Sequence, residues 1–95
     1  MAVGDAIIAH SSVGNGAVLT IQPAGSTVWL IQNLYMGGAW ELHRTDGSND
    51  FSFQTGTTAD ALQQRMMVAT NTVYFTLKNT SGGAVYMGYD GFVLA

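Results

Sequence analysis

Apolar and polar residues alternate along most of this chain, and that alternation limits the folds open to it. In the clearest stretch, 73–78, Val73, Phe75 and Leu77 share one parity and more polar residues take the other. A period of two places alternate side chains on opposite faces of a β-strand. Residues 28–31 are apolar on both parities, which indicates a strand covered on both sides or one whose outer face meets a partner. The alternation recurs at 17–21, 40–44, 51–54 and 85–89.

Turn-forming residues separate these stretches. Asn15 and Gly16 tolerate positive φ, as a type I′ hairpin turn requires. Asp90 and Gly91 predict a bend or bulge before a short last strand at 92–94. Further turn signals lie at 23–26, 36–38, 46–49 and 81–83. About eight strands at this spacing, with almost no helix, predict one all-β domain spanning 1–95. This spacing is typical of a small antiparallel β-sandwich or of a β-barrel.

Residues 58–67 do not follow the alternation. Thr58 is a suitable N-cap for a helix, and Leu62 and Met66 are four residues apart, as on one helical face. The other interpretation is a loop that leads into a strand at 64–68. The sequence leaves both open and favours the strand for the second half.

The inward parity of the predicted strands defines a candidate core. Because the parity repeats on every predicted strand, both layers of the sandwich are expected to contribute to it. The predicted core residues are Leu19, Ile21, Trp40, Leu42, Phe51, Phe53, Val73, Phe75, Leu77, Val85 and Met87.

Charged residues are rare in this chain. Asp, Glu, Lys and Arg make up 9% of it, against about 25% in an ordinary soluble domain. Such a surface can be buried against other copies of the chain without desolvating many charges, so we expect a homo-oligomer. The net charge is −3, and the three cations, Arg44, Arg65 and Lys78, are scattered. Nucleic acids and anionic membranes both require a basic cluster, so neither is an expected partner.

Three further absences in the sequence bear on its class. There is no cysteine, and hence neither a disulfide nor a thiolate metal site. No apolar run is long enough to span a bilayer, and the first residues lack the features of a signal peptide. We therefore expect a complete small gene product made in a cytoplasm.

No set of residues points to catalysis or metal binding. His43 and Glu41 share a strand face, but two ligands are too few for a metal site, and a surface pair is the simpler interpretation. His10 precedes two serines without the Gly-x-Ser-x-Gly turn of a nucleophile. The acidic spacing in 46–50 covers only half of a calcium loop, and a hairpin loop that caps its own backbone explains it. We expect a protein that is not an enzyme, with no metal and no cofactor.

Aromatic residues are the strongest candidates for a binding surface. Tyr74 lies on the outward parity of its strand, and other aromatics lie in or beside predicted strands. Tyrosine and tryptophan anchor protein interfaces, whereas stacked aromatics beside Asn, Gln and Asp also form sugar sites. We favour a subunit interface over a sugar site. The predicted interface or ligand aromatics are Trp29, Tyr35, Tyr74 and Tyr86.

Several hairpin motifs resemble small jelly-roll structural proteins of tailed bacteriophages. One strand ends in Leu-Lys-Asn at 77–79, a Thr-Ser-Gly-Gly turn follows, and the next strand closes on Tyr-Asp-Gly at 89–91. The opening Met-Ala-Val-Gly-Asp, the segment Gly-Ala-Val-Leu-Thr-Ile-Gln-Pro at 16–23 and the following Trp-Leu-Ile strand resemble them too. The likeness covers most of the chain. It implies a small antiparallel β-sandwich of jelly-roll type with about eight strands, and a related Greek-key order is the alternative.

Among these virion proteins, a chain this short is most similar to head-decoration or cement proteins. The resemblance implies a non-enzymatic structural protein that binds the outer head surface, commonly as a homotrimer, and stabilises the capsid. The implied partner is the major capsid protein or another virion protein. The implied location is the capsid surface of the virion, after synthesis in the host cytoplasm. The alternatives are a phage tail or fibre component, and a carbohydrate-binding β-sandwich module that takes a glycan.

Overall fold

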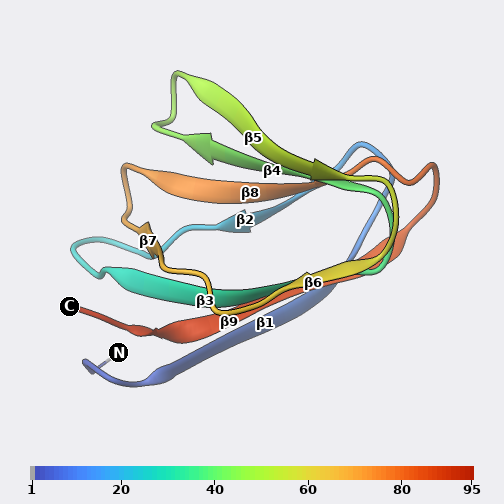
Figure 1. Ribbon diagram of the computed structural model, residues 1–95. Coiled ribbons are helices and arrows are strands. Elements are labelled where there is room, and N and C mark those ends of the chain that lie inside the picture. Colours follow the sequence, from blue (N-terminus) through green and yellow to red (C-terminus); the bar gives the residue numbers. More distant parts are fainter. Residues whose placement is uncertain (1) are drawn as a thin grey trace.

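A computed structural model describes residues 2–95 of the chain. All regular structure in these residues is β-strand, and no helix that could cross a membrane occurs among them. Figure 1 shows the strands stacked in two layers. They are β1 (Ala6–Val13), β2 (Val18–Ile21), β3 (Trp29–Met36), β4 (Trp40–Thr45), β5 (Asp50–Gly56), β6 (Asp60–Leu62), β7 (Met67–Ala69), β8 (Tyr74–Asn79) and β9 (Val85–Val93).

The strands form two antiparallel sheets that pack face to face. Sheet A has the order β1-β9-β3-β6, with β7 also paired to β3, and sheet B has the order β2-β8-β4-β5. Most connections carry the chain from one sheet to the other. If β6 and β7 are taken as one interrupted strand, the eight resulting strands have the jelly-roll arrangement. The predicted jelly-roll-like sandwich is confirmed.

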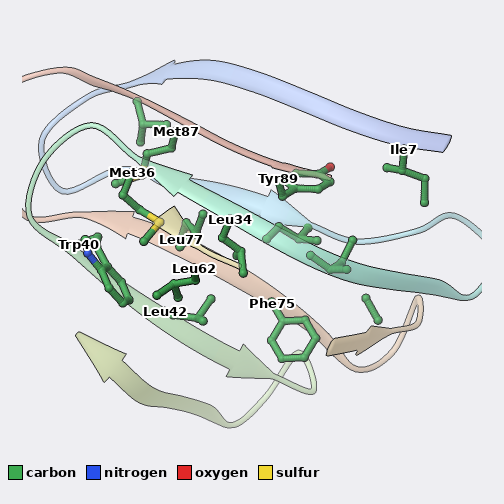
Figure 2. Close-up of a cluster of buried hydrophobic side chains, with 14 of the residues drawn as sticks. Ile7, Leu34, Met36, Trp40, Leu42, Leu62, Phe75, Leu77, Met87 and Tyr89 are labelled. Atoms are coloured by element: carbon green, nitrogen blue, oxygen red, sulfur yellow. The ribbon is translucent and has the colours of Figure 1, made fainter. Parts of the chain in front are cut away.

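The core lies between the sheets and receives side chains from both (Figure 2). On β8, Phe75 and Leu77 are buried between the sheets while Thr76 and Lys78 are only partly covered, as a period of two requires. The core prediction is confirmed for Ile21, Trp40, Leu42, Phe75, Leu77 and Met87, and Leu19 and Val85 pack against the same cluster. It omitted further side chains buried between the sheets, which are Ile7, Val13, Ile31, Leu34, Met36, Leu62, Ala69, Tyr89 and Val93. Leu30 is buried too, but it lies on the outward parity of β3.

Two predicted core residues, Phe51 and Phe53, are exposed. They lie on β5, the edge strand of sheet B, where a register shift between Leu42 and His43 leaves Phe53 as the extra residue of a bulge. The Phe53 ring meets the buried Phe75 ring edge-on, with centroids 6.1 Å apart. The prediction was wrong because alternation alone does not distinguish a covered strand from an edge strand.

The predicted hairpin turn at Asn15 and Gly16 is also wrong. β1 pairs with β9 in sheet A and β2 pairs with β8 in sheet B, so this turn crosses from one sheet to the other. Gly16 has a φ of 79°, but Asn15 does not have positive φ, which excludes a type I′ turn.

Two other local predictions need correction. Asp90 and Gly91 do not precede a separate strand, because β9 runs through both; the irregularity is in β3, between Ile31 and Asn33. The helical alternative for 58–67 is wrong as well. This stretch contains β6 and the first residue of β7, joined by a segment in which Gln64 has a φ of 57°.

A buried asparagine holds one end of the sandwich together. Asn79, at the end of β8, is fully buried, and its Nδ2 donates to the carbonyls of Val13 and Gly83 at 2.7 Å each. Its Oδ1 accepts from the backbone N–H of Ser81 at 2.8 Å and from the Ser81 hydroxyl at 2.7 Å. Every polar atom of the side chain is therefore satisfied, as burial requires.

Candidate interaction surface on the outer face of sheet A

The two outer faces of the sandwich differ in chemistry. On sheet B, the register aligns Thr20, Thr76, His43 and Ser52 across the four strands. Neighbouring outward positions of this face carry Lys78, Glu41 and Asp50. The outer face of sheet B is thus an ordinary polar surface that suits contact with water.

The outer face of sheet A is largely apolar and aromatic. One row aligns Ala6, Phe92, Leu30 and Val68 across β1, β9, β3 and β7. Ile8 on β1 is 68% exposed and Tyr86 on β9 is 71% exposed. Among the strand positions of this face, Asp90 is the one Asp, Glu, Lys or Arg. An apolar sheet face of this kind marks an interaction site more often than a free surface.

Asp90 lies in the centre of this face and is held by two side chains of β3. Asn33 Nδ2 donates to Asp90 Oδ1 at 2.7 Å, and the Tyr35 hydroxyl donates to Asp90 Oδ2. The hydrogen bond to the carboxylate, together with partial burial and the negative charge of Asp90, raises the pKa of the Tyr35 phenol above its ordinary value. The charge is thus covered by donors from the same sheet.

The β3 bulge positions this network. The register shift between Ile31 and Asn33 restores the alternation, so that Asn33 lies beside Asp90 on the outer face and Leu34 faces the core. Asn33 Oδ1 in turn accepts the backbone N–H of Gln64 at 3.2 Å, and Gln32 O accepts that of Arg65 at 2.7 Å. The bulge therefore also fixes the segment between β6 and β7.

An aromatic pair lies beside the network. His10 on β1 and Tyr35 on β3 are the two register partners of Gly88, and their rings meet edge to face with centroids 6.3 Å apart. A Cβ at Gly88 would overlap His10 Cδ2 and the Ala9 carbonyl oxygen. Glycine at this position therefore lets the two rings approach across the middle strand.

The structure places the four predicted aromatic site residues at three different locations, which are the two outer faces of the sandwich and its core. Tyr35 and Tyr86 lie together on the outer face of sheet A. Tyr74 is half-buried on the outer face of sheet B, opposite Thr45. Trp29 packs against the core and against Tyr89, with ring centroids 6.2 Å apart. Two of the four residues are brought together, and the other two are not.

The remaining polar candidates lie on sheet B. His43 Nε2 is 2.9 Å from Glu41 Oε1, and Nδ1 is 2.8 Å from Asp50 Oδ2. The two carboxylates contact opposite sides of the ring, so they do not converge on one point where an ion would bind. Within residues 2–95 there is no group of three or more His, Cys, Asp or Glu side chains arranged to hold a metal ion.

The loop at 46–49 caps its own backbone. Asp46 Oδ1 accepts the backbone N–H groups of Ser48 at 2.9 Å and Asn49 at 2.7 Å. These hydrogen bonds, that of Asn49 first, hold the pKa of Asp46 below its ordinary value. This is the local capping arrangement expected from the sequence.

Sequence reasoning missed Asp90, Asn33 and Ile8 as members of the outer face of sheet A. Asp90 was assigned to a bend because Asp-Gly pairs favour turns. The signal that identifies it is parity, because Tyr86, Gly88, Asp90 and Phe92 alternate with the buried residues of β9.

No protein-family model matches this chain, and no protein of curated function matches its sequence.

Proposed function

We propose that this chain is a non-enzymatic structural protein of a bacteriophage virion, which decorates the outer head surface as an oligomer and stabilises it. The observation that carries the proposal is the difference between the two outer faces of the sandwich. A polar face suits water and an apolar, aromatic face suits burial against a partner. The resemblance to head-decoration proteins supplies the kind of partner, which is the major capsid protein.

The chemistry of the outer face of sheet A supports docking on a large protein surface. Ile8, Tyr86 and Phe92 provide apolar contact area. The Asp90 carboxylate already accepts hydrogen bonds from Asn33 and Tyr35, so a partner would not leave it without donors. An oligomer adds multivalency, because the second and third attachments are intramolecular. With few charges in the contact, attachment should weaken little as salt increases.

The proposal is tested by co-sedimentation of the purified protein with phage heads that lack it. We expect Tyr86→Ser and Ile8→Ser to weaken attachment by about tenfold or more, because each removes an exposed apolar anchor. Tyr74→Ser on the outer face of sheet B is the matched control and should attach as the wild-type protein does. Equal attachment by all three variants would show that the proposed face is not the docking face, and no attachment by the wild type would reject decoration.

A second candidate function is glycan binding, and one observation favours it. The carboxylate of Asp90 and the amide of Asn33 lie on the same face as the exposed ring of Tyr86, which is the combination of polar and stacking groups that sugar sites use. A glycan array with the wild-type protein and Tyr86→Ala tests it. Binding that is lost in the variant would favour this function, as in a fibre component or a carbohydrate-binding module.

A further inference from the structure

A second surface, which shares Val68 with the outer face of sheet A, lies on one open side of the sandwich. Between β5 of sheet B and β7 of sheet A there is a groove of about 490 Å³. Phe75, which is buried, forms part of its lining, and Phe51, Phe53, Met66 and Val68 surround it. Met66 is 84% exposed and Phe51 is 71% exposed. Nine large hydrophobic side chains are exposed among residues 2–95. Four of the nine, Phe51, Phe53, Met66 and Val68, line this groove, so exposed apolar surface is concentrated here.

Opposite charges lie at one end of the same groove. It continues into a hollow of about 410 Å³ lined by Arg44, Phe51, Asp46 and Asp50. Asp50 pairs with His43, whereas Arg44 and Asp46 form no ion pair with any part of residues 2–95. The turn N–H groups, that of Asn49 first, hold the pKa of Asp46 below its ordinary value. The rim therefore carries one cation and one anion that lack partners of opposite charge.

The backbone of β5 is also unpaired along one edge. β5 pairs with β4 on one side only and is the last strand of sheet B. Residues 51–56 contain no charged residue and no proline, which are the usual means by which proteins block an edge strand. Apart from Asp50 at the start of β5, the bulge at Phe53 is the one protective feature of this edge.

We propose that this groove is the contact surface for a second copy of this chain, in a two-fold arrangement. In such a contact both copies use the same patch, related by a two-fold rotation, so that residue i of one copy contacts residue j of the other and residue j contacts residue i. The phenylalanines and methionines of the two copies then cover one another, and Arg44 of each copy faces Asp46 of the other. Residues 51–56 of the edge strand carry no charge and so add no like-charge repulsion to this contact. A groove that carries both signs of charge at one end of an apolar region can be complementary to itself when the two-fold axis passes between the two charges.

This inference rests on the oligomeric part of the proposed function and adds the surface by which copies associate. A two-fold contact joins subunits in pairs, so on its own it gives a dimer. Combined with a separate three-fold contact, of the kind that the resemblance to decoration proteins implies, it would join two trimers. In both cases the particle contains an even number of chains.

The first test is light scattering coupled to size exclusion over a dilution series. We expect the wild type to have the mass of an even number of 10.1 kDa chains. The variants Phe51→Ser and Met66→Ser should begin to dissociate at a protein concentration about tenfold or more above that at which the wild type dissociates. Val18→Ser is the matched control, because Val18 is an exposed apolar residue on β2, the opposite edge of sheet B. A wild type with one or three chains, or variants that dissociate like the wild type, would overturn the proposal.

The second test exchanges the charges. Arg44→Glu and Asp46→Lys should each weaken self-association, since each places like charges opposite one another. An equimolar mixture of the two variants should associate again, because both cross-contacts are then attractive. If Asp46→Lys does not fold, Asp46→Asn keeps an acceptor for the turn and should weaken association by itself. Unchanged association in both Arg44→Glu and the folded Asp46 variant contradicts the two-fold geometry.

The failures of this inference and of the proposed function are distinguishable. Head attachment is measured with variants of the outer face of sheet A, whereas self-association is measured with variants of the groove. A wild type that attaches to heads as a trimer, with no effect of Phe51→Ser on its mass, rejects the groove contact and retains decoration. If the wild type is a dimer that does not bind phage heads, the groove contact is retained and decoration is rejected.

Discussion

Among single residues, Asp90 most directly sets the chemistry of the outer face of sheet A. Its carboxylate accepts the Tyr35 hydroxyl and raises the pKa of that phenol above its ordinary value of 10.0. Because the folded-state pKa is raised, the stability contributed by protonated Tyr35 is complete below about pH 10 and is lost as pH increases through the folded-state value.

We therefore predict that Asp90→Asn lowers the pKa of Tyr35 toward that of a free phenol. The substitution removes both the charged acceptor and the negative charge beside the ring. Phenolate absorbance as a function of pH measures this pKa, and subtraction of the curve for Tyr35→Phe isolates Tyr35 from the other tyrosines. An unchanged titration in Asp90→Asn would show that the hydrogen bond is not formed in solution.

Gly91 provides a second prediction at the residue scale. A Cβ at this position would overlap the Leu30 carbonyl oxygen and approach Ile31 Cα at 2.9 Å, so the clash is with backbone that does not move easily. We expect Gly91→Ala to lower the unfolding free energy by about 3 kcal/mol or more. Gly14→Ala is the control, since nothing lies within 4 Å of its Cβ, and it should cost about 0.5 kcal/mol or less. Urea denaturation measures both, and equal stability of the two variants is the contrary result.

At the scale of the strands, β8 and β5 illustrate what alternation predicts and what it does not. Both strands carry phenylalanine on the parity predicted to face inward, but Phe75 of β8 is buried and Phe51 of β5 is exposed. β8 lies inside sheet B, whereas β5 lies at its edge, and strand order depends on contacts between distant parts of the chain. The passage from one sheet to the other at Asn15 and Gly16 could not be predicted for the same reason. A tight turn has similar residues whether the following strand pairs with the preceding one or joins the other sheet.

This contrast predicts different costs for the same substitution. Phe75→Ala should lower the unfolding free energy by about 3–5 kcal/mol, because it leaves a cavity between the sheets. Phe51→Ala should change it by about 0.5 kcal/mol or less, when measured at a concentration at which the chain is monomeric. Chemical denaturation of both variants checks the assignment. Comparable losses would mean that β5 is covered in solution and that the groove is closed.

At the scale of the whole molecule, the alternation and the turn spacing narrowed the fold to a β-sandwich or a β-barrel, and the resemblance to jelly-roll proteins implied the arrangement that the sheets have. The candidate surface was predictable only in part. Tyr35 and Tyr86 could be predicted as surface aromatics because they lie in strands. Their neighbour Asp90 could be assigned to the same face only from the register of β9 against β3. The central claim is that one outer face of the sandwich is buried in an assembly while the other remains in water.

Oxidative footprinting by hydroxyl radicals tests that claim most directly, because each outer face carries one histidine and at least one tyrosine. The protein is oxidised in isolation and when bound to phage heads, and the modified residues are quantified by mass spectrometry. The account predicts that His10 and Tyr86 lose reactivity on binding while His43 and Tyr74 keep theirs. Protection of His43 and Tyr74 instead, or unchanged reactivity on both faces, would contradict it.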